Sequence, residues 1–268
     1  MKGHYAVVGN PIEHSKSPQI HAMFAEQTGE QLSYGRLWAP QDNFAAVARA
    51  FFCGGGLGLN VTVPFKEEAW QFANKLSERA HFAEAVNTLR CDDDGLLWGD
   101  NTDGVGLYRD LHDNLGIAIE AQRVLILGAG GAARGILADI LAGEPSEVVI
   151  ANRTAHRADE LAQRFEGVGS CGLDNIPGRQ FDLIINTTAA GLQGSMPALA
   201  DGLLRHGGAC YDLVYSDTDT PFMEWARRHH AGQVADGLGM LVEQAAESFF
   251  LWRGVRPDTQ PVIGALRG

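Results

Sequence analysis

The amino-acid sequence predicts an α/β fold with mostly parallel strands. Short apolar runs end in Gly, Asn or Thr, and stretches of helical composition separate them. This alternation is typical of repeated strand and helix units around a parallel sheet. At 268 residues, the chain suits one large domain or two domains of moderate size. The plainest predicted strands are 5–8, 57–63, 124–127, 148–151, 183–186 and 209–214.

The charge balance excludes some partners. The chain has 21 Lys and Arg against 33 Asp and Glu, a formal net charge of −12. Because a phosphate array must be neutralised by clustered cations, nucleic acid and anionic membrane surfaces are poor partners. An anionic ligand must therefore find a local cationic pocket.

No segment reaches the roughly 18 apolar residues that a membrane span needs. The chain opens on a short apolar strand without a charged leader, so we expect a soluble, cytoplasmic protein. We also predict no metal site: the run 92–94 of three aspartates suits a solvated turn, and neither His14 nor His21 has acidic or cysteine neighbours at ligand spacing. The cysteines lie far apart, without a C-x-x-C pair, and are expected to be reduced: Cys53, Cys91, Cys171 and Cys210.

The first predicted helix ends at Gly29 and starts near Ser17, with Ser17 as its N-cap and Pro18 at its first position. Capping alone would explain Ser17. However, Ser15 lies close by, and two hydroxyls at the positive end of a helix also suit a carboxylate ligand. Both interpretations stay open.

Lys66 stands in an unusual place. Pro64 is expected to open a helix, so Lys66 lies in the first turn, where the helix macrodipole favours acidic residues. Broken local rules tend to mark functional positions. We expect this environment to disfavour the ammonium form and to move the Lys66 pKa toward a range useful for proton exchange. The alternative is a surface ion pair with Glu67 or Glu68.

Asp103 lies in a second polar segment, within the string Gly-Asp-Asn-Thr-Asp-Gly of residues 99–104. A turn at 92–95 between two apolar pieces predicts a β-hairpin that brings Asn87 close to 100–103. Asp103 could also be a simple turn or cap residue. The case for function is convergence, because several polar residues follow or flank predicted strand ends, where ligands bind in open α/β sheets: Ser15, Ser17, Thr62, Lys66, Asn87 and Asp103.

Toward the C-terminus, Asp236 and Gly237 precede a predicted helix over 240–252. Its Gln244 shares a face with apolar residues. An amide in that position is either a satisfied core group or a partner for a polyhydroxylated ligand.

A glycine-rich loop follows the predicted strand 124–127. The residues Gly128-Ala129-Gly130-Gly131-Ala132-Ala133 fit the pattern G-x-G-x-x-A between a strand and a helix. In that setting, glycines let backbone amides approach a pyrophosphate at the helix N-terminus. The sequence therefore predicts a Rossmann-type dinucleotide site.

The strand 148–151 ends in Asn152-Arg153-Thr154, with Arg157 one turn later. An NAD site usually has Asp or Glu here to hold the ribose 2′-hydroxyl, whereas arginine suits a 2′-phosphate. We therefore predict NADP as the cofactor in preference to NAD. The alternative is that both arginines are ordinary solvated helix residues.

Taken together, these strings resemble the shikimate dehydrogenase family from Gly9 to about Gln244. The matching segments are 14–18, 60–66, 85–88, 99–104, 152–154 and 236–244. The resemblance implies an N-terminal substrate domain completed by C-terminal helices (1–103 and 238–268) and an inserted NADP-binding domain (104–237). It also implies the reversible, NADP-linked reduction of 3-dehydroshikimate to shikimate, on the route to chorismate and the aromatic amino acids.

The resemblance also implies roles for individual residues. Lys66 and Asp103 would be catalytic. The substrate carboxylate would contact Ser15, Ser17 and Tyr215, and the substrate hydroxyls and reacting oxygen would contact Thr62, Lys66, Asn87, Asp103 and Gln244. The cofactor would contact Gly128, Ala129, Gly130, Gly131 and Ala132 through its pyrophosphate, Asn152, Arg153, Thr154 and Arg157 through its adenosine phosphate, and Leu213, Gly237 and Met240 near its nicotinamide. Leu213 departs from the family, which often has methionine there.

Two alternatives stay open. One is a quinate/shikimate dehydrogenase of broad specificity. The other is a non-catalytic module that binds NADP or a shikimate-like acid and regulates a partner, although such a module would not need both Lys66 and Asp103. The sequence leaves the oligomeric state open between monomer and homodimer.

Overall fold

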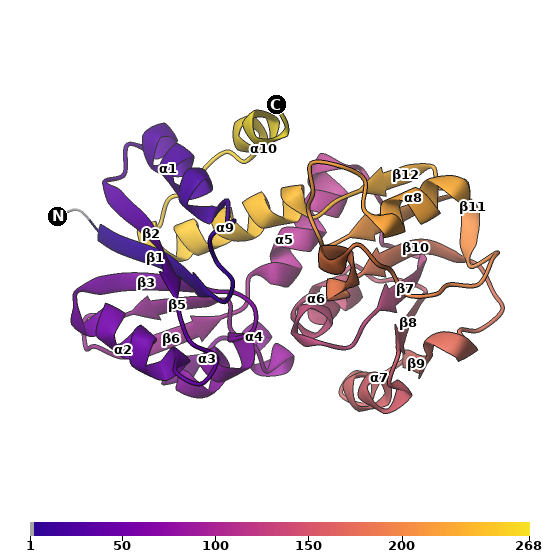
Figure 1. Cartoon of the computed structure of the whole chain (residues 1–268), viewed down its shortest axis with the longest axis horizontal. Coiled ribbons are helices and arrows are strands. Elements are labelled where there is room, and N and C mark those ends of the chain that lie inside the picture. The colour runs from indigo at the N-terminus through magenta and orange to yellow at the C-terminus, as the bar shows by residue number, and fades with distance from the viewer. Residues whose placement is uncertain (1–2) are drawn as a thin grey trace. The chain divides into compact units, whose positions relative to one another are not determined.

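The computed structural model describes residues 3–268, apart from the side chains of 192 and 193. The chain forms two compact units. Unit 1 comprises the chain up to Gly106 together with Leu241–Gly268, and unit 2 comprises Leu107–Met240. Both are sheets covered by helices, which confirms the predicted α/β class (Figure 1).

Unit 1 contains a six-stranded mixed sheet in the order β2-β1-β3-β5-β6-β4. The strands β1, β2 and β3 are parallel, and β5 and β6 form the predicted antiparallel hairpin beside β3. The hairpin aligns Thr88 with Asp100, so the residues just outside its two strands lie side by side. The strands are β1 Gly3–Gly9, β2 Leu32–Trp38, β3 Gly56–Val61, β4 Lys75–Leu76, β5 Thr88–Cys91 and β6 Leu97–Asp100.

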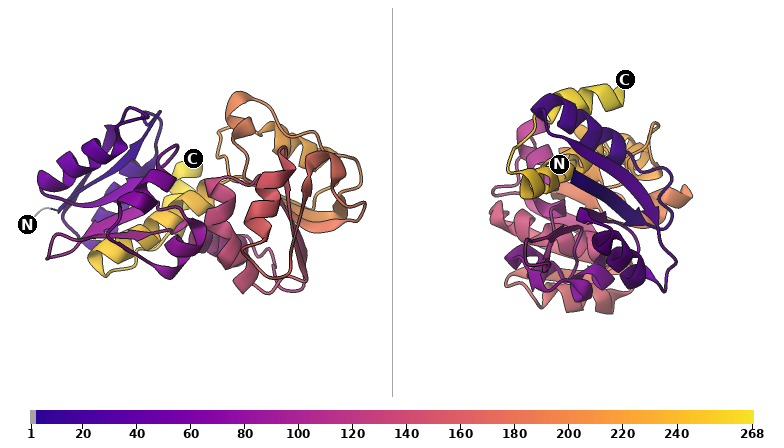
Figure 2. Two further views of the ribbon diagram at one scale, coloured as in Figure 1. Left: turned by 90° about the horizontal axis from the view of Figure 1, so that it is seen from below. Right: turned by 90° about the vertical axis from the view of Figure 1, so that its left-hand side faces the viewer.

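Helices cover both faces of this sheet (Figures 1 and 2). On one face, α2 and α3 bury Phe44 and Phe65 in a core with the sheet residues Val8 and Leu59. On the other face, α1, α9 and α10 share a second core around Phe249. The helices are α1 Ser17–Thr28, α2 Phe44–Cys53, α3 Lys66–Phe72, α4 Glu78–Ala83, α9 Leu238–Arg253 and α10 Gln260–Arg267.

Unit 2 contains a six-stranded parallel sheet in the order β12-β11-β10-β7-β8-β9. Chain order reverses between β7 and β10, and such a switch point is where ligands bind in open α/β sheets. The strands are β7 Arg123–Leu127, β8 Glu147–Asn152, β9 Val168–Gly172, β10 Phe181–Asn186, β11 Leu204–Asp212 and β12 Gln233–Ala235.

Alternate residues of β7 face opposite cores. Val124 and Ile126 pack with α6 and α7, whereas Leu125 and Leu127 pack with α8. A strand that is apolar on both faces in this way is typical of a parallel sheet with helices on each side. The helices are α6 Gly131–Ala142, α7 Ala155–Ala162 and α8 Pro221–Arg228, with a π-helical turn at Asp110–Asn114 and 3-10 turns at Leu173–Asn175 and Ala189–Gln193.

Both connections between the units fall inside helices. The first is within α5 (Asp103–Arg109), between Gly106 and Leu107, and the second is within α9, between Met240 and Leu241. The sequence-based division was placed at 103/104 and 237/238, near the first residues of these helices. The observed boundaries lie about three residues later, because the first turn of each helix belongs to the unit that precedes it.

Two starts of elements differ from prediction. Ser17 is the first residue of α1 and Lys16 occupies the cap position, without a side-chain capping bond. Helix α3 begins at Lys66 itself, so Pro64 lies in the turn before the helix. Pro18 is expected at the first helical position but lies at the second position of α1, and the helix after Pro64 is expected from Phe65 onward but begins one residue later.

Within residues 3–268, no helix is both long enough and apolar enough to cross a bilayer. The described residues also contain no group of three or more His, Cys, Asp or Glu side chains that could hold a metal ion. The four cysteines are free thiols, and only Cys210 is buried.

His21 provides a test of the unit 1 core. Its ring is fully buried, stacks 4.1 Å from the Tyr34 ring, and makes no hydrogen bond through either nitrogen. Burial lowers the pKa of this imidazole to about 3, with a smaller opposing effect from Asn60. The folded protein therefore disfavours the protonated ring, whereas the unfolded chain protonates it near its ordinary pKa.

We predict that His21→Phe flattens the acid side of the stability profile. As pH falls from about 6.5 toward 3, the wild type loses stability at up to about 1.4 kcal/mol per pH unit through His21. Above that window both states hold the neutral ring and the contribution is complete. Urea unfolding across this range would measure the difference between the two proteins. Parallel profiles would contradict the assignment.

Candidate active site

The central feature of unit 1 is an ion pair between Lys66 and Asp103. Lys66 is the first residue of α3 and Asp103 is the first residue of α5. The Lys66 Nζ atom lies 2.5 Å from Asp103 Oδ2, and the two side chains are 18% and 7% exposed. This pairing joins the two residues that the sequence left ambiguous, because Lys66 contacts Asp103 directly.

Asn87 occupies the other oxygen of Asp103. Its Nδ2 donates to Asp103 Oδ1 at 2.8 Å, and its Oδ1 accepts from the Thr102 backbone N–H at 2.9 Å. The predicted hairpin is responsible for this meeting, since Asn87 precedes β5 and residues 101–103 follow β6. Both oxygens of Asp103 therefore accept hydrogen bonds from nitrogen donors, one from Lys66 and one from Asn87.

Gln244 of α9 also reaches this cluster. Its Oε1 lies 3.4 Å from both Asn87 Nδ2 and Thr102 Oγ1, while its Nε2 donates to the Leu241 carbonyl within the helix. Gln244 is partly exposed and does not lie in the closed core. The structure therefore brings four of the predicted residues together: Lys66, Asn87, Asp103 and Gln244.

Ser15 lies in the segment between β1 and α1, and Ser17 is the first residue of α1. The Ser17 N–H donates to Ser15 Oγ at 3.3 Å, and the Ser15 carbonyl accepts from Arg36 Nε and Nη2 at 3.1 and 2.6 Å. Thr62 follows β3, and its N–H donates to the Val8 carbonyl at 3.0 Å. These hydroxyls follow the carboxyl ends of neighbouring strands, as predicted. Arg36, on β2, adds a positive charge beside Ser15, and the sequence analysis missed it.

In unit 2, the glycine-rich loop follows β7 at the switch point. Gly128 has φ of 107°, and a Cβ there would lie 2.5 Å from Thr187 Oγ1, so only glycine suits this position. Gly130 precedes α6 and Gly131 begins it, and a Cβ on either would meet nothing within 4 Å. The loop therefore leaves open space at the N-terminus of a twelve-residue helix, and Ala129 and Ala132 flank that space.

Positive charge gathers after β8. Asn152 Nδ2 donates to the Thr154 carbonyl at 2.9 Å, which shapes the turn into α7. Arg153 and Arg157 are exposed there. Burial lowers the pKa of Arg134 on α6, and the charges of Arg164 and Arg157 lower it further, so several guanidinium groups share this end of the sheet.

Leu213, Gly237 and Met240 also lie near one another within unit 2. A Cβ on Gly237 would lie 2.1 Å from the Leu213 carbonyl oxygen, so the two backbones are in direct contact. The Met240 N–H donates to the Tyr211 hydroxyl at 3.3 Å, and that hydroxyl donates to Asp110 at 2.6 Å. The start of α9 is thereby tied to β11. Tyr215 is partly buried in the segment after β11.

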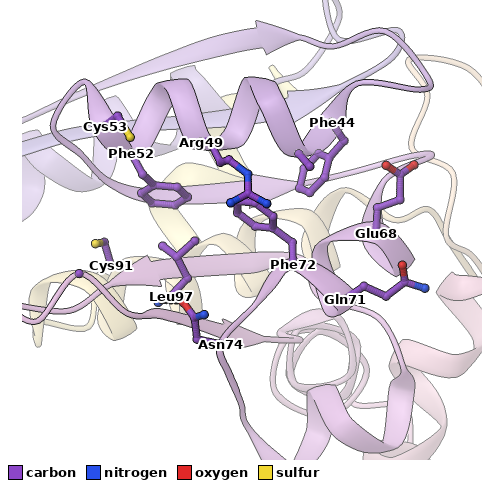
Figure 3. Close-up of a pocket in the computed structure, with 12 residues that line it drawn as sticks. Phe44, Arg49, Phe52, Cys53, Glu68, Gln71, Phe72, Asn74, Cys91 and Leu97 are labelled. Carbon is purple, nitrogen blue, oxygen red and sulfur yellow. Dashed lines mark hydrogen bonds between the residues drawn. The ribbon is translucent and has the colours of Figure 1, made fainter.

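A separate groove of about 680 Å³ lies between α2, α3 and the β5–β6 hairpin (Figure 3). Arg49 lies over the Phe72 ring at 5.2 Å, and Glu68 and Phe44 line the same space. None of the predicted site residues lines it. The groove therefore shares no residue with the Lys66–Asp103 cluster.

The fold and the two groups of residues define a class: an α/β protein with a Rossmann-type unit that carries a glycine-rich loop, and a second unit that carries a close Lys–Asp ion pair. Family models agree with this class. They match residues 7–89 to the shikimate dehydrogenase substrate binding domain, 111–193 to shikimate/quinate 5-dehydrogenase, and 237–267 to the shikimate 5'-dehydrogenase C-terminal domain.

Curated relatives extend the match over the whole chain. The chain is 62% identical to a Halorhodospira halophila protein named shikimate dehydrogenase (NADP(+)), covering 100% of this chain and 99% of the relative. It is 56% identical to a protein of the same name from Methylococcus capsulatus, covering 98% and 95%. The chain therefore belongs to the shikimate dehydrogenase family.

Solved structures agree on the fold. A Pseudomonas putida protein described as an Ael1 enzyme has a TM-score of 0.92 at 43% identity, covering 99% of this chain and 98% of that one. Shikimate 5-dehydrogenase from Thermus thermophilus, solved in complex with NADP(H) and shikimate, has a TM-score of 0.89 at 35% identity, with the same coverage.

Substitutions in the glycine loop would distinguish an effect on folding stability from an effect on NADP⁺ binding. Gly128→Ala forces a side chain into a positive φ and against Thr187, which we expect to cost about 1–3 kcal/mol of stability. Gly130→Ala has open space and a φ of −90°, so we expect stability within about 0.5 kcal/mol of the parent. If a pyrophosphate approaches the loop, Gly130→Ala nevertheless weakens NADP⁺ binding about tenfold.

Urea unfolding and NADP⁺ titration by fluorescence would measure both effects. Unchanged NADP⁺ affinity in a stable Gly130→Ala protein would show that no pyrophosphate approaches this residue.

Proposed function

We propose that the protein is an NADP-dependent shikimate dehydrogenase, which catalyses the reversible reduction of 3-dehydroshikimate to shikimate in chorismate and aromatic amino acid biosynthesis. The observation that carries this proposal is the Lys66–Asp103 pair. Its Nζ and Oδ2 atoms lie 2.5 Å apart, and the two residues begin α3 and α5. The names of full-length relatives at 52–62% identity support it.

The residues of unit 2 fit NADP. The open space above Gly130 and Gly131 suits a pyrophosphate, and Arg153 and Arg157 suit an adenosine 2′-phosphate. Residues 128–132 would hold the pyrophosphate and 152–157 the adenosine phosphate, with Leu213, Gly237 and Met240 near the nicotinamide. When bound, the reduced cofactor supplies the hydride for the ketone carbon.

The residues of unit 1 fit a hydroxylated carboxylic acid. Ser15 and Ser17 would bind the carboxylate, with Tyr215 as a further contact, and Thr62, Asn87 and Gln244 would bind hydroxyls. Lys66 would donate a proton to the alkoxide oxygen as it forms, and in reverse would accept the hydroxyl proton. Asp103 would hold Lys66 in place and stabilise its positive charge.

Several further assignments belong to this proposal. Residues 1–103 and 238–268 would form the substrate domain, and 104–237 the NADP domain. The enzyme would work in the cytoplasm as a monomer or homodimer. With a net charge of −12, it would not take nucleic acid as a partner.

One alternative retains support. The match over 111–193 is to a model described as shikimate/quinate 5-dehydrogenase, and the similar Pseudomonas putida structure is described only as an Ael1 enzyme. A broad-specificity enzyme would differ in how it accommodates one extra hydroxyl. A non-catalytic binding module is disfavoured, since it would gain nothing from a close, partly buried Lys66–Asp103 pair.

Substrate and cofactor comparisons test the proposal. We expect NADPH to form with shikimate, and catalytic efficiency to fall at least about tenfold when quinate replaces shikimate or NAD replaces NADP. Steady-state absorbance of the reduced cofactor would measure all four combinations. Equal efficiency with quinate would favour the broad-specificity alternative, and absence of turnover with every combination would reject the enzyme.

Lys66→Ala tests the mechanism. We expect kcat to fall roughly 10²- to 10⁴-fold, because the variant lacks the positioned proton donor, with a smaller change in KM. Lys75→Ala is a matched control, since Lys75 lies over the Trp98 ring at 4.8 Å and belongs to no proposed site. A Lys66→Ala protein with a raised KM and an unchanged kcat would make Lys66 a binding residue only.

A further inference from the structure

A buried layer of polar side chains lies behind Asn87. Thr88 follows it on β5, Asn60 lies opposite Thr88 on β3, and Ser248 packs onto both from α9. Thr88 is 1% exposed, Ser248 is fully buried and Asn60 is 6% exposed. Burying polar groups costs free energy unless they are hydrogen-bonded, and every one of these side chains has a hydrogen-bond partner.

The donors in this layer can be followed from Tyr34 through Asn60 and Thr88 to Asn87. The Tyr34 hydroxyl donates to Asn60 Oδ1 at 2.7 Å, so the Asn60 Nδ2 end faces Thr88 Oγ1, at 3.1 Å. An amide nitrogen only donates, so Thr88 accepts there. Thr88 has one hydroxyl hydrogen, and its two acceptors are Asn87 Oδ1 at 2.9 Å and Ser248 Oγ at 2.7 Å. Ser248 can instead supply the hydrogen of the contact with Thr88, although its hydroxyl also reaches the Gln244 carbonyl at 3.0 Å.

Together with the Thr102 N–H and hydroxyl, which donate to Asn87 Oδ1 at 2.9 and 3.2 Å, the Thr88 hydroxyl favours the orientation in which the Asn87 Nδ2 faces the ion pair. With its Oδ1 accepting from Thr88 and from the Thr102 N–H, Asn87 presents its Nδ2 to Asp103 at 2.8 Å. A reversed amide would place an oxygen against the carboxylate. The local potential would become more negative, and Lys66 would keep its proton to higher pH.

We propose that Thr88 is a positioning residue whose hydroxyl orients the Asn87 amide toward Asp103 and thereby sets the pH at which Lys66 exchanges its proton. Thr88 acts through Asn87, since it contacts neither Lys66 nor Asp103 in this network. The inference deepens the proposed function, because it rests on Lys66 as the group that exchanges a proton.

Other charges near the pair remain in place when Thr88 is changed. Asp100 and Glu247 both accept from Arg79, at 2.7 and 3.3 Å, so these neighbouring acids are already paired. The titratable groups on the elements that pack around the pair include Glu67 and Glu68 of α3, Glu78, Arg79 and His81 of α4, Asp100 of β6, and Glu243, Glu247 and Arg253 of α9. At the far end of the network lie His21 of α1 and Tyr34 of β2.

The test compares Thr88→Val with Thr88→Ser. Valine keeps the shape of threonine but removes the hydroxyl, whereas serine keeps the hydroxyl. Thr88→Cys is a second variant that retains a side chain of similar size with a much weaker donor, in case valine impairs folding. Because the Thr102 N–H still donates to Asn87, we expect the amide orientation to weaken and not to be lost.

Two readouts apply to each protein. The first is the pH dependence of Lys66 acetylation in competitive labelling, followed by mass spectrometry without substrate. The second is the pH profile of kcat for shikimate oxidation, which needs neutral Lys66. For Thr88→Val and Thr88→Cys we expect the labelling midpoint and the acid limb of kcat to move to higher pH by about half a unit. Thr88→Ser should match the parent.

The outcomes separate the two proposals. A folded Thr88→Val or Thr88→Cys protein with a parental labelling midpoint would overturn the role of Thr88, as would a shift of equal size in Thr88→Ser. If the labelling midpoint shifts as expected but the parent does not oxidise shikimate, the positioning role stands and the proposed function fails.

Discussion

A nearly buried carboxylate imposes the strictest requirement on unit 1. Asp103 is 5% exposed, and an ionised group in that position is tolerated only when its oxygens accept strong hydrogen bonds. Lys66 meets the requirement at one oxygen and Asn87 at the other. Three separate pieces of the chain must therefore meet: the start of α3, the residue before β5, and the residues after β6. The antiparallel hairpin inside an otherwise parallel sheet is the element that brings the last two together.

The same requirement extends outward from the ion pair. Asn87 is held by backbone and hydroxyl donors, and the buried layer of Asn60, Thr88 and Ser248 satisfies the groups behind it. Asp100 is hydrogen-bonded to Arg79. Burial would raise the pKa of Asp100, but the Arg79 guanidinium outweighs that effect, so the pKa of Asp100 is lowered. The polar centre of unit 1 is thus a connected network, and its members are coupled rather than additive.

Unit 2 is built from repeated strand and helix units around a parallel sheet. Its parallel strands are buried on both faces, so polar groups are confined to the strand ends. Gly128 turns sharply against Thr187, which leaves the N-terminus of α6 accessible. Guanidinium groups gather after β8, in a chain with a net charge of −12. This local concentration of positive charge is what the overall acidity of the chain demands of any site for a phosphate.

Local patterns were reliable where a residue type has one dominant physical meaning. The glycine loop, the apolar strands and the hairpin turn at 92–95 all lie where the sequence places them. Predictions were wrong at the starts of α1 and α3, because proline tolerates the turn before a helix as well as its first positions. Arg36 was missed, since nothing in the sequence reports that it lies beside Ser15. Arg134 directly follows the glycine loop in the sequence but was given no role.

The sequence by itself determined the α/β class, the nucleotide loop and the identities of the polar residues at strand ends, because hydrophobic periodicity and glycine geometry are local properties. Only the tertiary structure decided that Lys66 pairs with Asp103, that Asn87 presents its nitrogen to that carboxylate, and that Thr88 and Ser248 lie behind it. The Lys66–Asp103, Asn87–Asp103 and Thr88–Ser248 contacts join residues 16 to 160 positions apart along the chain, and their hydrogen-bond directions depend on partners supplied by other elements. The sequence left the partner of Lys66 and the contacts of Asp103 open, and the structure shows that the two side chains contact each other in a largely buried position.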